Sequence, residues 1–463
     1  MAIPEKVWHD STVRQALAEW DFGQVSRLVR QRSSLRQEDV AHLTGLSQAY
    51  LSMVESGSRK MNHIDKITQF LAGLGAPAGL VTLPLPHRAV PPAKPETYNP
   101  LEGDLDPTLP WTADRMVAAL NAAVGGGNVE RRKFLSVSGL ALTALVHQWG
   151  AEEAEPLERA AKGGKVSAKL LTSLQGTTDE LRIADASAGS GTVAQLGRTH
   201  IELLKLIIEQ STYDSTTGQA LAAILADTTT QTGWFYFDSG EEDRAQACFI
   251  AALRAAKASG DIRLGAGALS YMAIHAYSTG APKDAVTAAR AAREKAKGIN
   301  APALEAMLLT RQARGHSKLG ERQQAYQALG EASELCAQGR SENDPHWLYW
   351  INEGEIHGQA GSCYLDLNDP GRAAISLGRA QDALNPADLR TRGLFLSRTA
   401  TAHIRDGDAE AGVAAAHAAM DLAECLNSAR LATHVHSVVH ELHPLRHTSY
   451  ARDLIERAQT VQA

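Results

Sequence analysis

Cysteine and aromatic residues are scarce in this chain of 463 residues, and both shortages restrict its class. Aromatics make up 5% of the residues, whereas alanine is abundant from about residue 113 onward. Alanine-rich sequence with few aromatics favours closely packed helices over β-sandwiches. The cysteines lie far apart and form no CxxC pair, which indicates small apolar residues in a reducing compartment. They are Cys248, Cys336, Cys363 and Cys425.

Long apolar runs are missing, and so is an excess of positive charge. No segment approaches the roughly 20 apolar residues that a membrane-spanning helix needs. Residues 1–22 are charged and lack an apolar stretch, so they do not resemble a secretory signal and a cytoplasmic protein is expected. The formal net charge of −6 argues against a protein that coats nucleic acid with its whole surface. A small basic domain within the chain remains compatible with that charge.

The motifs of common enzyme classes are absent from the sequence as well. Gly163-Gly164-Lys165-Val166 lacks the spacing of a phosphate-binding loop, and no GxGxxG, GxSxG or HExxH occurs. The acidic residues are scattered, so no pair of catalytic carboxylates can be assigned. We therefore expect a protein that is not an enzyme and needs no cofactor.

Histidines gather near the C-terminus, where His436, His440 and His443 would share one face of a helix. Such a face could hold a metal ion, or it could simply be a polar surface that is weakly sensitive to pH. No carboxylate or cysteine completes a convincing set of ligands. We therefore favour the polar surface and expect no metal.

Proline marks a boundary between domains. Nine of the 17 prolines lie between residues 77 and 110, a density that excludes a helix and predicts an extended linker. The sequence therefore predicts an all-α protein of four parts. These are a helix-turn-helix bundle with an N-terminal extension over 1–75, a Pro-rich linker over 76–112, a helical connecting segment over 113–192 and a helical repeat domain over 193–463.

The last part contains a repeat that is fixed by its turns. Turn residues recur at Gly240, Gly280, Gly320, Asn368 and Gly407, with spacings of 40, 40, 48 and 39 residues. The positions seven residues before, five after and twelve after each turn are all glycine or alanine. Antiparallel helices that cross closely need small residues where their backbones approach, and a Gly or Asn to end the first helix. Five helix pairs are therefore predicted.

This pattern resembles the tetratricopeptide repeat, whose small residues and turn glycine fall at these offsets within a 34-residue unit. Trp234, Tyr236 and Phe249 stand near the bulky positions of that family. The units here are longer, the closing proline is mostly absent and the aromatic positions are eroded, so the repeats are divergent. The resemblance covers residues 219–425 and implies an α-solenoid, with helices at 193–210 and 428–460 capping the stack.

The N-terminal part has the organisation of a helix-turn-helix. A short helix, a tight turn at Thr44-Gly45-Leu46 and a second short helix with Ser47 as its N-cap follow one another. Gly45 permits a left-handed turn, and Leu46, Leu51 and Val54 would anchor the second of these helices in the core. The helices are expected over 11–18, 23–32, 36–43, 47–55 and 63–74.

This stretch resembles the repressor-type (Xre/Cro-like) helix-turn-helix family, whose pattern is LSQ…LA…GVS…IS..E.G. Arg36 departs from the common Ser of that pattern. Together with the linker and the repeats, the chain is similar to actinobacterial regulators that join such a helix-turn-helix domain, which reads DNA and is called the reader below, to a repeat domain. The residues that carry the resemblance are Leu35-Arg36-Gln37, Val40-Ala41, Thr44-Gly45-Leu46-Ser47, Leu51-Ser52 and Glu55-Ser56-Gly57.

The resemblance implies that the helix after the turn enters the major groove of double-stranded DNA. Gln48 would read adenine, and Ala49 or Met53 would contact a thymine methyl group. Gln37 matches the family position that grips a phosphate, Arg59 and Lys60 suit phosphates, and Glu55 is structural. The outward positions of the reading helix are expected to be Ser47, Gln48, Ala49, Tyr50, Ser52 and Met53.

The charge of this part is consistent with DNA binding. Residues 23–75 carry seven positive and four negative groups, a net of +3, so the rest of the chain carries about −9. That asymmetry helps to keep the larger part away from DNA. The alternative is a small module for docking another protein.

The two-fold operators typical of such readers also predict a homodimer.

The repeats would form a superhelix whose concave face is lined by the first helix of each unit. Its mixture of aromatic and charged groups suits a peptide or small-molecule effector, although several of these residues could instead lie between repeats. A second alternative is a platform for another protein, with no small ligand. The residues expected to face the groove are Trp234, Asp238, Ile274, Tyr277, Arg314, Lys318, Asp366 and Arg405.

Overall fold

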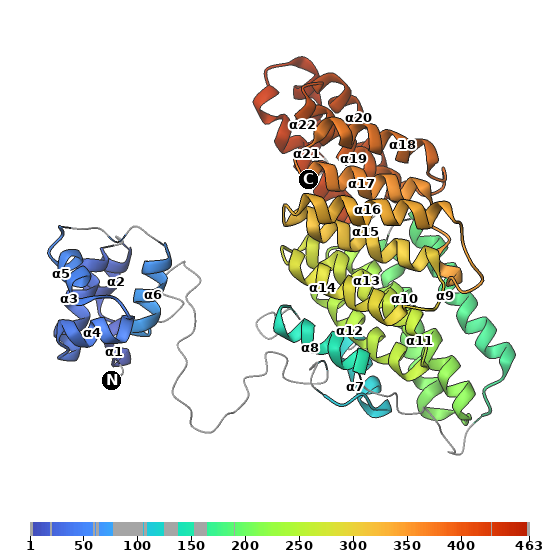
Figure 1. The fold of residues 1–463 in the computed structure, drawn as a ribbon, viewed down its shortest axis with the longest axis horizontal. Coiled ribbons are helices and arrows are strands. Elements are labelled where there is room, and N and C mark those ends of the chain that lie inside the picture. Colours follow the sequence, from blue (N-terminus) through green and yellow to red (C-terminus); the bar gives the residue numbers. More distant parts are fainter. Residues whose placement is uncertain are drawn as a thin grey trace. The chain divides into compact units, whose positions relative to one another are not determined.

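The computed structural model describes residues 3–18, 21–58, 61, 64–76, 105, 109–124, 138–151, 164–188, 190–426 and 428–460 (Figure 1). Within these ranges every regular element is a helix, and the only β-type pairing is an isolated bridge between Lys165 and Thr212. The predicted all-α class is confirmed. The chain divides into two compact units, Met1–Tyr98 and Asn99–Ala463.

The described part of the N-terminal unit contains six helices around one apolar core. Its largest fully buried side chains include Leu17, Leu51, Phe70 and Leu71. Trp8 is also buried there. The helices are α1 (Glu5–Trp8), α2 (Ser11–Ala18), α3 (Phe22–Ser33), α4 (Gln37–Thr44), α5 (Gln48–Glu55) and α6 (Ile64–Leu74).

The larger unit is built around five consecutive pairs of packed helices (Figure 1). Within each pair the two helices are joined by a short turn, as the repeat pattern predicts. The pairs are α11 (Ser215–Asp238) with α12 (Glu242–Ser259), α13 (Ile262–Ser278) with α14 (Pro282–Ala296), α15 (Pro302–Lys318) with α16 (Arg322–Ala337), α17 (Glu353–Asp366) with α18 (Pro370–Ala383), and α19 (Leu389–Asp406) with α20 (Ala409–Cys425).

The turns and the small residues around them explain the pairing. All five turn residues adopt positive φ angles, between 56° at Asn368 and 93° at Gly407, which is the left-handed region that glycine and asparagine tolerate. All fifteen flanking glycines and alanines are buried. At Gly233, for example, an added Cβ would lie 2.6 Å from the ring of Phe249. Small residues therefore set the close approach of the two helices in each pair.

Further helices flank the five pairs. α7 (Ala113–Val124) and α8 (Leu140–Ala151) pack on α12 and α14, and both share the core of the array. At the other end, α21 (Ala429–Leu442) packs on α19, and α22 (Ser449–Thr460) packs on α20. Two short 3-10 helices, η2 (His346–Leu348) and η3 (His443–Leu445), lie in the connections.

Residues 151–192, which have only a weak helical pattern, nevertheless contain the 21-residue helix α9 (Ala168–Ala188). α9 is followed by α10 (Ser190–Gln210). Several Thr and Ser hydroxyls of α9 donate to the carbonyl oxygen four residues earlier, for example Thr172 to Ala168 at 3.1 Å. Such bonds satisfy the hydroxyl groups without adding to the stability of the helix, so contacts with α10 and α11 stabilise α9.

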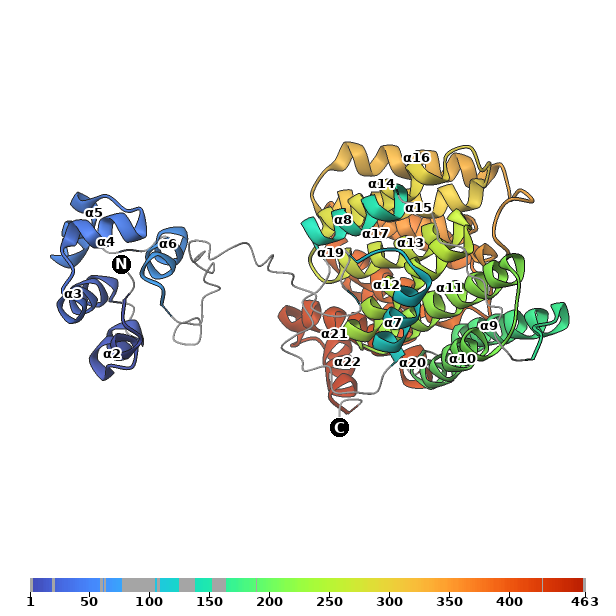
Figure 2. The ribbon, with the colours of Figure 1, turned by 90° about the horizontal axis from the view of Figure 1, so that it is seen from below.

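The array curls until its first and last helices meet. α9 contacts α19, and α11 contacts α21, although these pairs lie about 200 residues apart in the sequence. Figure 2 shows this unit from below, with α9 at its edge. The concave side of the superhelix is therefore narrowed by these contacts and contains a pocket that is partly open to solvent.

Two of the four cysteines pack as small apolar residues. Cys248 and Cys363 are fully buried and free, and burial raises the pKa of the Cys248 thiol to about 12. Cys336 is only partly buried and Cys425 is exposed, so the expectation does not hold for these two. None of the helices within the described ranges combines the length and apolar character needed to cross a membrane.

Candidate nucleic-acid interface and internal pocket

The turn between α4 and α5 has the geometry that the sequence predicts. Gly45 has a φ of 68°, where any Cβ would be strained. Ser47 then begins α5 as its N-cap, and its Oγ accepts a hydrogen bond from the backbone N–H of Tyr50 at 3.3 Å. α4, this turn and α5 form a helix-turn-helix.

α5 is held against the core along one side. Leu51 and Val54 are buried, and Leu46 of the turn is buried beside them. α3 approaches α5 closely, because a Cβ on Gly23 would lie only 2.3 Å from the carbonyl oxygen of Val54. The opposite face of α5 is exposed. It carries Ser47, Gln48, Ala49, Ser52 and Met53, as predicted.

Tyr50 departs from the predicted outward set. Its side chain is 8% exposed and belongs to the core of the bundle. The Lys66 ammonium of α6 lies 4.4 Å from the centre of its ring, a cation–π contact that helps to hold α6 against α5. The expectation that Tyr50 points outward is therefore wrong, because the ring follows Leu46 and Leu51 into the space between α5 and α6.

A buried carboxylate joins α3, α4 and α5. Glu55 accepts hydrogen bonds from Ser26 Oγ at 2.6 Å, from Arg30 Nε and Nη2 at 2.9 and 2.7 Å, and from Gln37 Nε2 at 3.0 Å. We call these four residues the Glu55 brace. Burial opposes ionisation of Glu55, but the hydrogen bonds from Arg30 and Ser26 outweigh it and hold its pKa below the usual range. The predicted structural role of Glu55 is confirmed.

The Glu55 brace uses only one of the two hydrogen-bond donors of the Gln37 amide. Its amide nitrogen carries two hydrogens, so one can donate to Glu55 while the other serves a phosphate. The predicted phosphate contacts Arg59 and Lys60 lie outside the described residues. Arg30 and Arg32 are engaged within the unit, with Glu55 and Asp10. The basic surface of the unit is therefore smaller than its net charge indicates.

The larger unit encloses a pocket of about 930 Å³, its open mouth included. Every first helix of the five pairs contributes to its wall, as the repeat register predicts, and α9 and α21 close it. The position nine residues before each turn lines the pocket in all five pairs. These residues are Gln231, Tyr271, Arg311, Gln359 and Arg398.

Three of the residues expected in the groove, Trp234, Ile274 and Tyr277, line this pocket. Arg314 and Lys318 lie behind the wall, paired with Asp366 at 2.6 and 3.2 Å. These three residues do not line the pocket, and neither do two others. The expected positions lie two to six residues before each turn, whereas the wall of the pocket is centred about nine residues before each turn. The two others are Asp238, which is fully buried, and Arg405, which pairs with Glu441 at 2.6 Å.

The pocket also contains groups that the sequence analysis missed. Asp185 of α9 and Arg390 of α19 form a buried ion pair across the closure of the array. The Arg390 guanidinium lies 5.0 Å from the ring centre of Trp234. The guanidinium of Arg430 on α21 lies 5.3 Å from the centre of the same ring. These contacts depend on the curl of the array, so spacing within single repeats could not reveal them.

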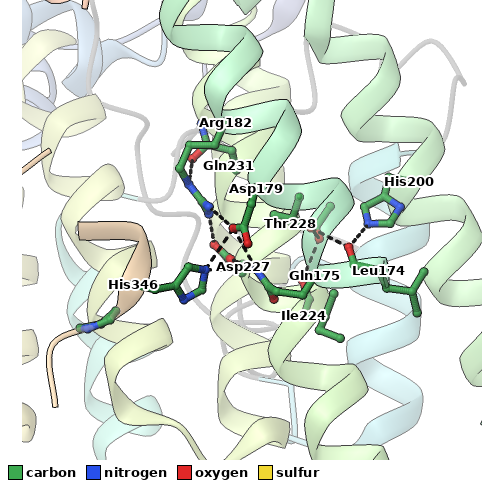
Figure 3. A network of polar contacts seen from close by, with 12 residues as sticks. Leu174, Gln175, Asp179, Arg182, His200, Ile224, Asp227, Thr228, Gln231 and His346 are labelled. Atoms are coloured by element: carbon green, nitrogen blue, oxygen red, sulfur yellow. Dashed lines mark hydrogen bonds and ion pairs between the residues drawn. The ribbon is translucent and has the colours of Figure 1, made fainter. Parts of the chain in front are cut away.

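A polar network supports one wall of the pocket (Figure 3). Arg182 donates to Asp227 and to Asp179, at 2.6 Å each, and His346 of η2 lies 3.0 Å from Asp179. Gln175 donates to Asp227 at 2.9 Å. The network ties α9 to α11 and to the connection that carries η2.

Within the described ranges, Asp179, Asp227 and His346 are also the only three His, Cys or acidic residues close enough together for a metal ion. The Arg182 guanidinium already binds both carboxylates, and its positive charge would repel a cation at this place. The histidines near the C-terminus do not form such a group among the described residues. The network therefore fits a structural role better than a metal site.

Comparison with known proteins agrees with the geometry of the smaller unit. Residues 21–83 match the family model of a helix-turn-helix domain, a span that begins at the N-cap of α3 and includes α4, α5 and α6. No curated protein matches the chain. The protein therefore combines a helix-turn-helix domain with an array of paired helices.

Proposed function

We propose that this chain is a transcription regulator that binds a double-stranded DNA operator through α5. The exposed face of α5, opposite a firmly anchored apolar face, carries the proposal. Gln48 would make a bidentate contact with adenine, and Ala49 or Met53 would meet a thymine methyl group. Gln37 would bind a phosphate beside the groove. The protein would act in the cytoplasm as a binding protein, not as an enzyme.

Selection of duplexes from a random pool by the full chain tests this proposal. We expect Gln48→Glu to weaken binding to the selected duplex by about tenfold or more, because the change loses a base contact and places a negative charge in the groove. Gln15→Glu, the same change on the exposed face of α2, is the matched control and should have little effect. Equal affinities of the two variants would refute the placement of α5 in the groove.

For the larger unit we propose divergent tetratricopeptide repeats that bind a small molecule or a short peptide. The pocket supports a small ligand, since it is lined from all five pairs and combines aromatic with charged side chains. The same combination of reader and repeats characterises the actinobacterial regulators that the sequence resembles. Ligand control then requires different affinities for the DNA-competent and DNA-incompetent states.

The second candidate is a docking platform for another protein. A ligand-dependent rise in the melting temperature of the full chain would favour the pocket as a ligand site. Copurification of a stoichiometric protein partner, without any such rise, would favour the platform. The lining of the pocket by all five helix pairs favours the first outcome.

We further propose that the protein is a homodimer. Leu196, Leu203 and Leu206 are each about half exposed on α10 and recur at spacings of seven and three residues, a pattern suited to helix–helix association. Two copies joined there would present two readers to a two-fold operator. Light scattering should give twice the chain mass, and Leu203→Glu should halve it. A monomeric mass for the unaltered chain would refute the dimer.

A further inference from the structure

The charges that line the internal pocket are not balanced. Three acidic side chains, Asp185, Glu355 and Asp388, face five arginines. The net charge of the lining is therefore positive by two, in a unit whose overall charge is negative. The arginines are Arg182, Arg311, Arg390, Arg398 and Arg430.

Three of the five arginines have acidic partners. Arg182 pairs with Asp227 at 2.6 Å, Arg390 with Asp185, and Arg311 with Glu355 at 3.7 Å. These pairs hold neighbouring helices together and need no further explanation.

Arg398 and Arg430 differ from the other three, because neither forms an ion pair with any carboxylate of the described residues. Arg398 is 9% exposed, and its Nη1 donates to the neutral hydroxyl of Ser362 at 2.7 Å. Arg430 rests on the rings of Trp234 and Phe237, at 5.3 and 5.7 Å. Asp238 interacts electrostatically with Arg430 but forms no ion pair with it.

The pKa values of Arg398 and Arg430 indicate that a negative charge in the pocket would stabilise both groups. Burial, together with the nearby Arg314 and Arg430, lowers the pKa of Arg398 to about 9. Burial likewise lowers the pKa of Arg430. Arg398 and Arg430 share one pocket without ion-pair partners, which destabilises the protein in the absence of a ligand. An anion placed between them would offset the energetic cost of burying the two charges and reduce their mutual repulsion.

Aromatic rings stand beside these cations. Trp234 and Tyr277 line the pocket on the α11 and α13 side, and Phe395 lies one helical turn from Arg398 on α19. Flat apolar walls next to a positive site suit a ligand that is part ring and part anion. Arginine also offers planar, multiple donors for carboxylate and phosphate groups.

We propose that the pocket binds a small aromatic acid, with its carboxylate or phosphate held by Arg398 and Arg430 and its ring packed against Trp234, Tyr277 and Phe395. This inference rests on the proposed sensing function and names the chemical class of the effector. Both anions share the recognition chemistry, so the experiment includes one of each.

Calorimetric titration of the full chain with 1-naphthyl phosphate and with 1-naphthoate tests the proposal. At least one of the two should bind, and should do so about tenfold or more tightly than the neutral 1-naphthol or inorganic phosphate alone. The double variant Arg398→Gln with Arg430→Gln should lose about tenfold or more of that affinity. Glutamine keeps a donor for Ser362, and Arg405→Gln, at a pair outside the pocket, is the control.

Arg430→Gln alone provides a second variant if the double variant does not fold, because Arg430 is partly exposed and lies on α21, outside the five helix pairs. Failure of both aromatic acids to bind, or equal binding by the neutral ring, would overturn the proposal. So would unchanged binding by either arginine variant. Binding of the selected duplex is measured on the same preparations, so failure of the pocket can be distinguished from failure of the DNA reader.

Discussion

The two units of this protein bury polar groups in different ways. In the helix-turn-helix unit, the Glu55 carboxylate is surrounded by donors from α3 and α4, and its charge is matched by Arg30. In the array, Arg398 and Arg430 face an internal pocket without a carboxylate partner among the described residues. A completed network stabilises a fixed shape, whereas an incomplete one leaves a place for a ligand. The difference is what the proposed DNA-reading role of the first unit and the proposed ligand-binding role of the second would require.

The largest effect should come from removing the centre of the brace. Glu55→Ala leaves Arg30 and Ser26 without their shared acceptor and should lower the unfolding free energy of the N-terminal unit by about 3 kcal/mol. Calorimetry of the full chain should show a lower melting temperature for this unit and an unchanged melting temperature for the array. Glu38→Ala, on the exposed face of α4, is the control. Equal losses in the two variants would show that the brace is not the stabilising element.

The same brace predicts a smaller loss in acid. The pKa of Glu55 is lower in the folded than in the unfolded protein, so its contribution to stability is complete above about pH 4.5 and is lost as the pH falls through the folded pKa. Denaturant unfolding between pH 6 and 3 should show this decline for the N-terminal unit. Glu55→Gln should remove that part of the pH dependence. An identical slope in the variant would contradict the assignment.

The array should be sensitive to the size of its buried alanines. Ala419 of α20 lies at one of the close-packing positions and is 1% exposed, whereas Ala414 on the same helix is exposed. Ala419→Leu should lower the unfolding free energy of the array by about 2 kcal/mol, because the added carbons have no space. Ala414→Leu should change it by less than about 0.5 kcal/mol. Similar effects of the two changes would contradict the close-packing explanation of the repeat.

The smallest effect concerns the start of α4. Arg36 occupies the N-cap position, with φ and ψ of −84° and 165°, but no hydrogen bond from its own side chain caps the helix. Its backbone N–H donates to Asp39 at 2.7 Å, which is half of a capping box. Arg36→Ser should complete the box and raise the melting temperature of the reader, with a gain of about 0.5–1 kcal/mol. Arg36→Ala should bring no gain, and a similar gain from both would argue against capping.

Much of the fold could be predicted from the sequence because each feature depends on neighbours in the chain. Ser47, Gly45 and the buried leucines of α5 act within a few residues of one another, and the five turns act within single helix pairs. Burial of Tyr50 was missed, since it depends on where α6 packs. The helical segment predicted over 113–192 does contain α9, but the length of this helix was not predicted, because contacts with other helices outweigh its weak pattern.

The pocket shows the same limit more clearly. The repeat predicts which helices face inward, but it does not fix how far the superhelix closes. Closure moves the inner wall to the level of Arg311 and Arg398, nine residues before their turns, and away from Arg314 and Lys318. It also brings Asp185 to Arg390, a contact between helices that the sequence places far apart.

Protection of guanine N7 from methylation, measured on a selected duplex with the full chain, tests the central claim most directly. N7 lies in the major groove, so α5 bound there should protect guanines in one short segment, or in two segments about one helical turn apart for a dimer. Gln48→Glu should abolish this protection and Gln15→Glu should preserve it. Bound DNA without N7 protection, or protection that persists in Gln48→Glu, would contradict the account.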